Sequence, residues 1–124
     1  MVVRILIPVA DDSGLKSRLS EHFGRTPYFS IVELNEKGEL VGQETVPNSD
    51  EHFGGGGRRA DFVLKLKPNV IIVYGMGVRG LSIYQGVKVP VLRANADTVE
   101  KVVEAYRKNE LEELTEGCHE ARNP

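Results

Sequence analysis

Short, almost wholly apolar stretches separated by helical patterns constrain the fold of this chain more than any other feature. Residues 3–9 form one such stretch, interrupted by Arg4, and residues 70–74 and 87–92 form two more. Runs of this kind are typical of strands that are buried on both faces of a sheet. Because helical spacing separates the last two runs, we expect parallel strands joined by a right-handed crossover.

A hairpin is predicted between the first apolar run and the first helix. Residues 28–34 and 40–46 are rich in aromatic and β-branched side chains, and residues 35–38 carry a turn sequence, Asn-Glu-Lys-Gly. Two such segments around a short turn are typical of antiparallel strands. The hairpin must therefore lie at one side of the sheet.

Three helices are predicted from apolar residues at helical spacing, over residues 58–67, 78–85 and 99–106. Gly86 is expected to cap the end of the second helix. Asp97 is the expected N-cap of the third helix, with Glu100 as its capping-box partner. The predicted element order is therefore β-β-β-α-β-α-β-α.

This order predicts an α/β fold with three layers, α/β/α, around a five-stranded mixed sheet, and the topology resembles the ribonuclease H-like motif. Residues 1–124 form a single expected domain. Leu111 and Leu114 lead into charged sequence, so a flexible tail is expected from about residue 115. The predicted core includes six strand residues: Ile5, Ile7, Ile71, Val73, Val89 and Val91.

The histidines suggest a ligand site. His22 lies in HFGR, His52 lies in HFGGGG, and His119 follows Cys118. Imidazole is the commonest protein metal ligand, and glycine lets the backbone approach a ligand closely. Cys118 is the only cysteine, which excludes an internal disulfide and a four-cysteine iron–sulfur site within one chain.

Glycine-rich turns are predicted where ligands bind in open α/β sheets, beyond the carboxyl ends of the strands. Residues 11–13 follow the first strand, residues 54–57 open the first helix beside Arg58, and Gly75-Met76-Gly77 opens the second helix. The start of a helix has unpaired N–H groups and a positive dipole end, so it attracts anions. These loops together predict a site for a metal-containing or anionic ligand.

Two enzyme-like interpretations have little support. Gly75, Gly77 and Gly80 match a dinucleotide-binding pattern, which needs an acidic residue after the next strand to bind the ribose. That strand ends in Leu92-Arg93-Ala94 instead, and the domain is too small for the usual two halves. A two-metal nuclease needs several converging carboxylates to hold its metal ions, and Asp11 and Asp12 could supply only one part of such a site.

Three segments carry a family resemblance: SEHFGRTPYFSIVEL, HFGGGG before a helix, and VIIVYGMGVRGLSIYQGVKVPVL. Over about residues 3–107 the chain resembles the dinitrogenase iron-molybdenum cofactor biosynthesis family. The resemblance implies a ribonuclease H-like domain without nuclease activity. It implies a non-catalytic carrier that binds an iron–sulfur or iron–molybdenum-type cluster, or its precursor, and passes it on.

The resemblance also implies site residues. Carried over to this sequence, they are His22, Gly24, Arg25, His52, Gly54, Gly55, Gly56 and Gly57. The glycine turns add Arg58, Gly75 and Gly77 as candidate cofactor-binding residues. The predicted metal ligands are His22, His52, Cys118 and His119.

Other function classes stay open at this point. A regulatory module that binds a small anion or a nucleotide without metal is the main alternative, and an enzyme of unknown type is a third. The expected partners are cluster donor and acceptor proteins, with a second copy of the chain as a further candidate. The net charge of −2 argues against nucleic acid, and no apolar run has membrane-spanning length. The start lacks a signal-peptide pattern, so a cytoplasmic location is expected.

Overall fold

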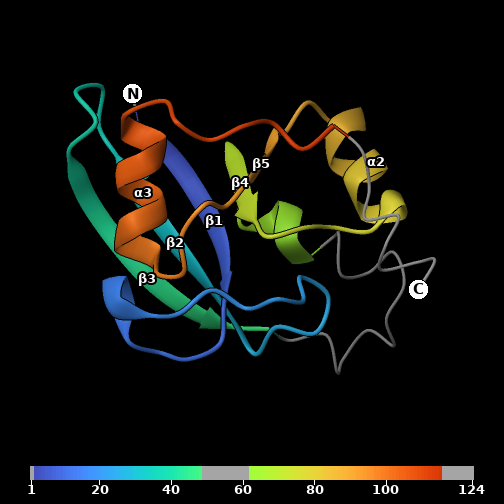
Figure 1. Cartoon of the computed structure of the whole chain (residues 1–124), viewed down its shortest axis with the longest axis horizontal. Coiled ribbons are helices and arrows are strands. Elements are labelled where there is room, and N and C mark those ends of the chain that lie inside the picture. Colours follow the sequence, from blue (N-terminus) through green and yellow to red (C-terminus); the bar gives the residue numbers. More distant parts are fainter. Residues whose placement is uncertain (1, 49–61, 116–124) are drawn as a thin grey trace.

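The fold is α/β with a five-stranded mixed sheet, as predicted. A computed structural model describes residues 2–48 and 62–115 of the chain. The strands lie in the order β3-β2-β1-β4-β5 (Figure 1). Their bounds are β1 Val3–Val9, β2 Tyr28–Leu34, β3 Leu40–Pro47, β4 Val70–Val73 and β5 Val91–Arg93. The helices are η1 Gly14–Lys16, α2 Val78–Gly86 and α3 Val99–Arg107, and residues 62–65 are also helical.

The sheet combines an antiparallel hairpin with parallel strands. β1 pairs antiparallel with β2 and parallel with β4, and β5 extends the parallel part. The hairpin turn has the predicted sequence: the Asn35 Oδ1 accepts hydrogen bonds from the Lys37 and Glu39 N–H groups. Gly38 completes the turn at φ +81°, a conformation that favours glycine.

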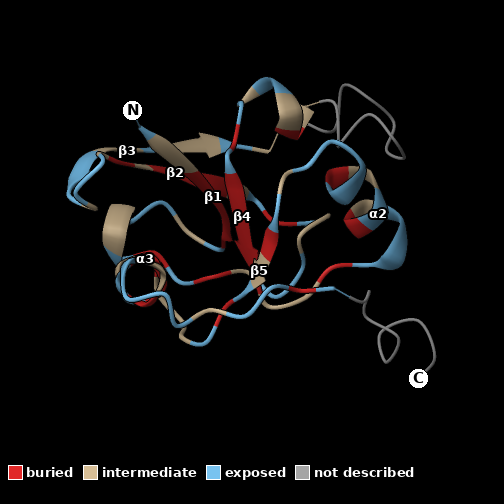
Figure 2. Cartoon of the chain, turned by 90° about the horizontal axis from the view of Figure 1, so that it is seen from above, coloured by how far each residue is buried: buried red, intermediate tan, exposed pale blue. Residues whose placement is uncertain are grey.

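Side chains alternate between two cores, one on each face of the sheet. The central strands β1 and β4 are coloured as buried in Figure 2. Ile5 and Ile7 pack on one face with α3, while Leu6 packs on the other with α2 and the helical residues 62–65. Five of the six predicted core residues are no more than 1% exposed: Ile5, Ile7, Ile71, Val73 and Val91. Both faces of the central strands are therefore buried, as their apolar sequence indicated.

The prediction for the last strand was wrong at its start. The segment expected from residue 87 becomes a strand only at Val91, because the chain is still turning after α2. Lys88 has φ +66°, and the Val89 N–H donates to the Tyr84 carbonyl. Val89 is therefore only half-buried. Gly86 is the last helical residue, and the left-handed position falls on Lys88 instead.

The N-cap of α3 was also misplaced by one residue. Thr98 is the N-cap and makes no side-chain capping hydrogen bond. The Asp97 carboxylate lies 3.6 Å from Arg18 and 3.5 Å from Lys101. The N–H of Val99 instead donates to the Ser17 carbonyl at 3.0 Å, so a neighbouring loop satisfies the helix start.

Residues 111–115 are held against the sheet by backbone hydrogen bonds to β5. The Leu114 N–H donates to the Val91 carbonyl at 2.7 Å, and the Arg93 N–H donates to the Glu112 carbonyl at 2.8 Å. Leu114 is buried in the α2-face core. The predicted tail beyond residue 115 lies outside the described residues. Within the described ranges, no helix has the length and apolar character needed to cross a membrane.

Candidate functional site

Several chain segments meet at one edge of the sheet, which we call the carboxyl edge because β1, β4 and β5 end there. Val9 at the end of β1 pairs with Tyr28 at the start of β2, and Tyr28 pairs with Pro47 at the end of β3. The loop that carries HFGR therefore lies at this edge, and so does the end of β3, from which the chain continues toward the glycine run. The Gly75–Gly77 turn follows β4 at the same edge.

The loop of residues 20–26 is fastened at both ends. The Ser20 N–H donates to the Pro8 carbonyl at 2.9 Å. Thr26 is buried, and its hydroxyl donates to the Val9 carbonyl at 2.8 Å. Between these anchors, the Ser20 hydroxyl accepts a hydrogen bond from the His22 N–H at 3.3 Å, and the His22 side chain is exposed. The fold therefore presents this imidazole to solvent from a fixed loop.

An aromatic cluster joins this loop to two other segments. The Phe23 ring lies 5.5 Å from the Phe29 ring of β2 and 5.9 Å from the Tyr84 ring of α2, between centroids. Phe29 in turn lies 6.2 Å from Phe62, which starts the described helical residues after the glycine run. We call Phe23, Phe29, Phe62 and Tyr84 the aromatic cluster. Sequence analysis did not single out Phe23, because its partners lie in distant segments.

The start of α2 has the features of an anion-binding helix terminus. Gly77 is the N-cap, with φ −64° and ψ 159°, and no side chain among the described residues caps the first turn. A Cβ at Gly77 would meet nothing within 4 Å, so the space beside it is open. Arg79 in the first turn is exposed. Free N–H groups, a dipole end and a cation together favour a negatively charged ligand.

Asp11 makes hydrogen bonds within its own loop, whereas a nuclease would need its carboxylate to hold a metal ion. Its Oδ2 accepts a hydrogen bond from the Arg18 N–H at 3.4 Å, and its carbonyl accepts one from the Ser17 hydroxyl at 2.9 Å. Hydrogen bonding from Ser13 is the main cause that lowers the pKa of the Asp11 carboxyl. Asp11 is therefore ionised and engaged in closing its own loop.

Tyr74 is a site residue that sequence analysis missed. It follows the last residue of β4 and directly precedes Gly75, at half-buried depth. Burial raises the pKa of its phenol, and the Asp97 carboxylate raises it further; Arg18 opposes this rise, and Glu21 adds the least to it. The phenol therefore keeps its proton at neutral pH. The sequence feature that could have identified Tyr74 is its place between an apolar strand and a glycine turn.

Five predicted site residues lie at or beside the carboxyl edge: His22, Gly24, Arg25, Gly75 and Gly77. The others fall outside the described residues: His52, Gly54, Gly55, Gly56, Gly57, Arg58, Cys118 and His119. In the described part of the chain, no three histidine, cysteine or carboxylate side chains group as metal ligands. The residues described here thus bring an imidazole and an uncapped helix start to one edge, without a complete ligand set.

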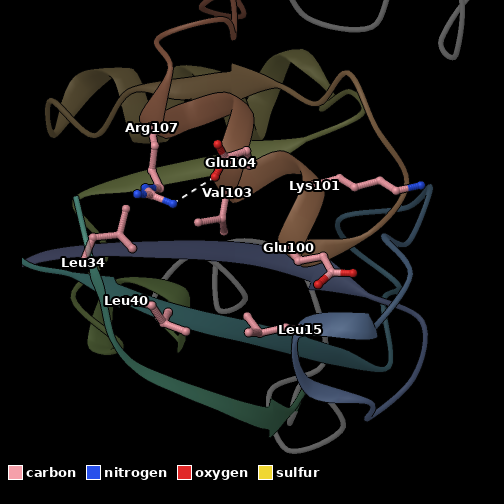
Figure 3. A pocket seen from close by; sticks show the side chains of 8 residues that line it. All are labelled: Leu15, Leu34, Leu40, Glu100, Lys101, Val103, Glu104 and Arg107. Carbon is pink, nitrogen blue, oxygen red and sulfur yellow. Dashed lines mark hydrogen bonds and ion pairs between the residues drawn. The ribbon is translucent and has the colours of Figure 1, made fainter.

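A separate groove lies on the α3 face of the sheet (Figure 3). It has a volume of about 470 Å³ and an apolar floor that includes Leu15, Leu34 and Val103. Charged side chains of α3 surround it, and Arg107 and Glu104 form an ion pair at 2.9 Å. None of the five predicted site residues that the structure describes lines this groove, so it is distinct from the carboxyl edge.

Comparison with known proteins places this arrangement in a family. The family model described as dinitrogenase iron-molybdenum cofactor matches residues 3–109. An uncharacterized protein of Methanocaldococcus jannaschii is 28% identical over 115 residues, which cover 91% of this chain and 92% of that protein.

Solved structures share the fold. The crystal structure of PH0822 has a TM-score of 0.77 at 25% identity, covering 91% of this chain and 96% of that one. The apo form of the orange protein from Desulfovibrio gigas has a TM-score of 0.75 at 19% identity, covering 91% and 93%. Since the family model spans most of the sequence, as the resemblance predicted, this chain belongs to the dinitrogenase iron-molybdenum cofactor family.

Proposed function

We propose that this protein is a non-catalytic carrier that holds an iron–sulfur or iron–molybdenum-type cluster, or its precursor, at the carboxyl edge. The observation that carries the proposal is that the His22 loop and the start of α2 both lie at that edge of the sheet. The family, named for a metal cofactor, supports the same conclusion. One structural neighbour is described in an apo form, a term used for proteins that also have a ligand-bound state.

The residues at this edge fit a cargo better than a permanent redox centre. Neutral imidazole is a suitable iron ligand, and unpaired helix-start N–H groups stabilise an anionic cluster. His22 would hold the metal, and the first turn of α2, with Arg79 and Arg25, would balance the negative charge. With few protein ligands, the bound state is expected to be weak and exchangeable, which is what transfer requires.

The second candidate is a regulatory module for a small anion or a nucleotide, without metal. The observation that favours it is the start of α2, where Gly77 is the N-cap and Arg79 in the first turn is exposed. The helix start and its arginine would bind a phosphate group by the same donors. The two candidates thus differ in whether His22 contacts a metal.

Partners and fold class complete the proposal. A carrier needs proteins that load and unload it, so we propose a cluster donor and a cluster acceptor as partners. We also propose the ribonuclease H-like motif as the class of this fold, supported by an antiparallel hairpin beside parallel strands in the order β3-β2-β1-β4-β5.

The test is cluster uptake by the full chain under anaerobic conditions, measured by metal analysis and visible absorbance. Wild type is compared with His22→Ala, His52→Ala and the double variant. We expect uptake by the wild type and reduced uptake by the variants, with uptake falling as the pH is lowered because a metal-bound imidazole must be neutral.

Two outcomes would redirect the proposal. Uptake that is unchanged in the double variant would remove histidine ligation. No uptake by the wild type, together with tight binding of a nucleotide or phosphorylated metabolite, would establish the small-anion module instead.

A further inference from the structure

Phe23 is more buried than the exposed residues beside it in the sequence, such as His22 and Arg25. It belongs to the HFGR loop at the molecular surface, yet its ring is half-buried and packs in the α2-face core. It meets Tyr84 edge-on at an interplanar angle of 75°, and Tyr84 is only 1% exposed. Edge-to-face pairs at this separation are attractive beyond the area that they bury.

The two hydrogen-bonded anchors of the loop leave its centre free. Ser20 and Thr26 fasten the ends to β1, but no hydrogen bond in the described part of the chain holds residues 23–25. Among the described residues, the two ring contacts of Phe23 are the interactions that attach this centre to the core. His22 is adjacent to that attachment, so the ring also limits where the imidazole is placed.

The ring contacts connect two parts of the candidate site. Phe23 touches Tyr84 in α2, the helix whose first turn follows Gly77. Phe29 joins Phe23 to Phe62, the first of the helical residues 62–65. A change at either contact is therefore transmitted through packed rings to the His22 loop.

We propose that Phe23 is a positioning residue, which orients His22 toward the ligand by docking the centre of the HFGR loop onto Tyr84. This inference rests on the proposed function where it concerns the ligand. Without the ring, the loop populates other arrangements. The apparent affinity then falls in proportion to the fraction of molecules whose loop is still in the arrangement that binds the ligand.

The first test titrates the full-length protein anaerobically with Co²⁺ alone, whose visible absorption reports imidazole ligation. Phe23→Ala is expected to weaken Co²⁺ binding about tenfold, the combined effect of two lost ring pairs. Phe23→Tyr keeps the ring and is expected to bind within about twofold of the wild type, a difference smaller than one ring pair accounts for.

Tyr106→Ala is the matched control, because Tyr106 is a half-buried aromatic residue on the other face of the sheet. It is expected to lower thermal stability and to leave Co²⁺ binding unchanged. Wild-type affinity in Phe23→Ala, or equal weakening in Tyr106→Ala, would overturn a positioning role.

The second test needs no ligand and separates this proposal from the carrier function. Amide hydrogen exchange is measured in the wild type and in Phe23→Ala without metal. Faster exchange confined to residues 20–26 and the last turn of α2, which contains Tyr84, is the expected result. If the wild type fails to bind Co²⁺, the carrier proposal loses its imidazole ligand, and exchange alone decides the role of Phe23. Unchanged exchange in Phe23→Ala would overturn that role.

Discussion

Asp11 is tied into its own loop, so its ionisation is linked to the stability of the fold. Its pKa is lowered in the folded state, chiefly by Ser13. The stabilisation is therefore present above pH of about 4 and is lost as the pH falls through the lowered pKa. Asp11→Asn is expected to be less stable than the wild type at pH 7 and to lose less stability on acidification, measured by urea unfolding between pH 3 and 7.

Asp12 is the matched control for this experiment, because it is an exposed neighbour with the same side chain. Asp12→Asn should unfold at nearly the wild-type urea concentration at each pH. An equal response of both variants would show that the loop does not depend on the Asp11 carboxylate.

The pKa of Tyr74 leads us to expect the opposite dependence of stability on pH. Burial and the carboxylates of Asp97 and Glu21 raise its pKa in the folded state. The unfolded chain therefore loses this proton first, so the associated stability is fully present below pH of about 10 and is lost as the pH rises beyond it. Tyr74→Phe should lose less stability than the wild type between pH 9 and 11 in urea unfolding. Asp97→Asn should lower the pKa of Tyr74 in a spectrophotometric titration, and an unmoved titration would exclude that carboxylate as a cause.

At the scale of secondary-structure elements, the uncapped start of α2 separates stability from binding. Gly77→Asp adds an N-cap carboxylate in open space, which should stabilise the fold by about 0.5 kcal/mol. The same charge should repel an anionic ligand and weaken its uptake. Gly77→Ser occupies a helix-start N–H without adding charge, so it should weaken uptake less than Gly77→Asp. Thermal unfolding and anaerobic cluster uptake measure the two effects, and stronger uptake by Gly77→Asp would exclude an anion at this helix start.

The segment that pairs with β5 is expected to stabilise the whole fold. Leu114 is 6% exposed in the α2-face core, so Leu114→Ala should lower the free energy of unfolding by about 2 kcal/mol. Leu111 is only partly buried, so Leu111→Ala should cost less. Denaturant unfolding of both variants checks the order, and a reversed order would mean that the segment contributes little through Leu114.

The elements were predictable where local pattern determines them. β1 and β2 match their predicted residues, because apolar and β-branched runs lie between clear turn signals. The start of β5 was predicted wrongly, because the alternation Val87-Lys88-Val89 is typical of a strand. In the structure, the chain leaves α2 there through a left-handed turn at Lys88. That turn depends on how α2 packs, which local sequence does not encode.

For the whole molecule, one sheet shared by two cores predicts cooperative unfolding. β1 contributes Ile5 to one core and Leu6 to the other, so neither core can persist once the central strands separate. We expect one urea transition, with equal midpoints by far-ultraviolet circular dichroism and by tyrosine fluorescence. Separate midpoints would mean that the faces unfold independently.

Topology also explains which part of the site the sequence could predict. The Gly75–Gly77 turn was placed correctly because parallel strands end at a common edge. The HFGR loop reaches that edge because β2 runs antiparallel to β1, a pairing that the predicted hairpin of residues 28–34 and 40–46 did not specify. The contact of Phe23 with Tyr84 depends on tertiary packing alone, so no local pattern predicted it.

The hairpin turn has a practical consequence for studying this protein. Residues 35–38 lie at the end of the hairpin that is opposite Tyr28 and Pro47, and Lys37 is exposed there. A molecule immobilised through a label at this turn would stand with the HFGR loop facing the solution. Donor and acceptor proteins could then be captured on a sensor surface without steric hindrance from the attachment point.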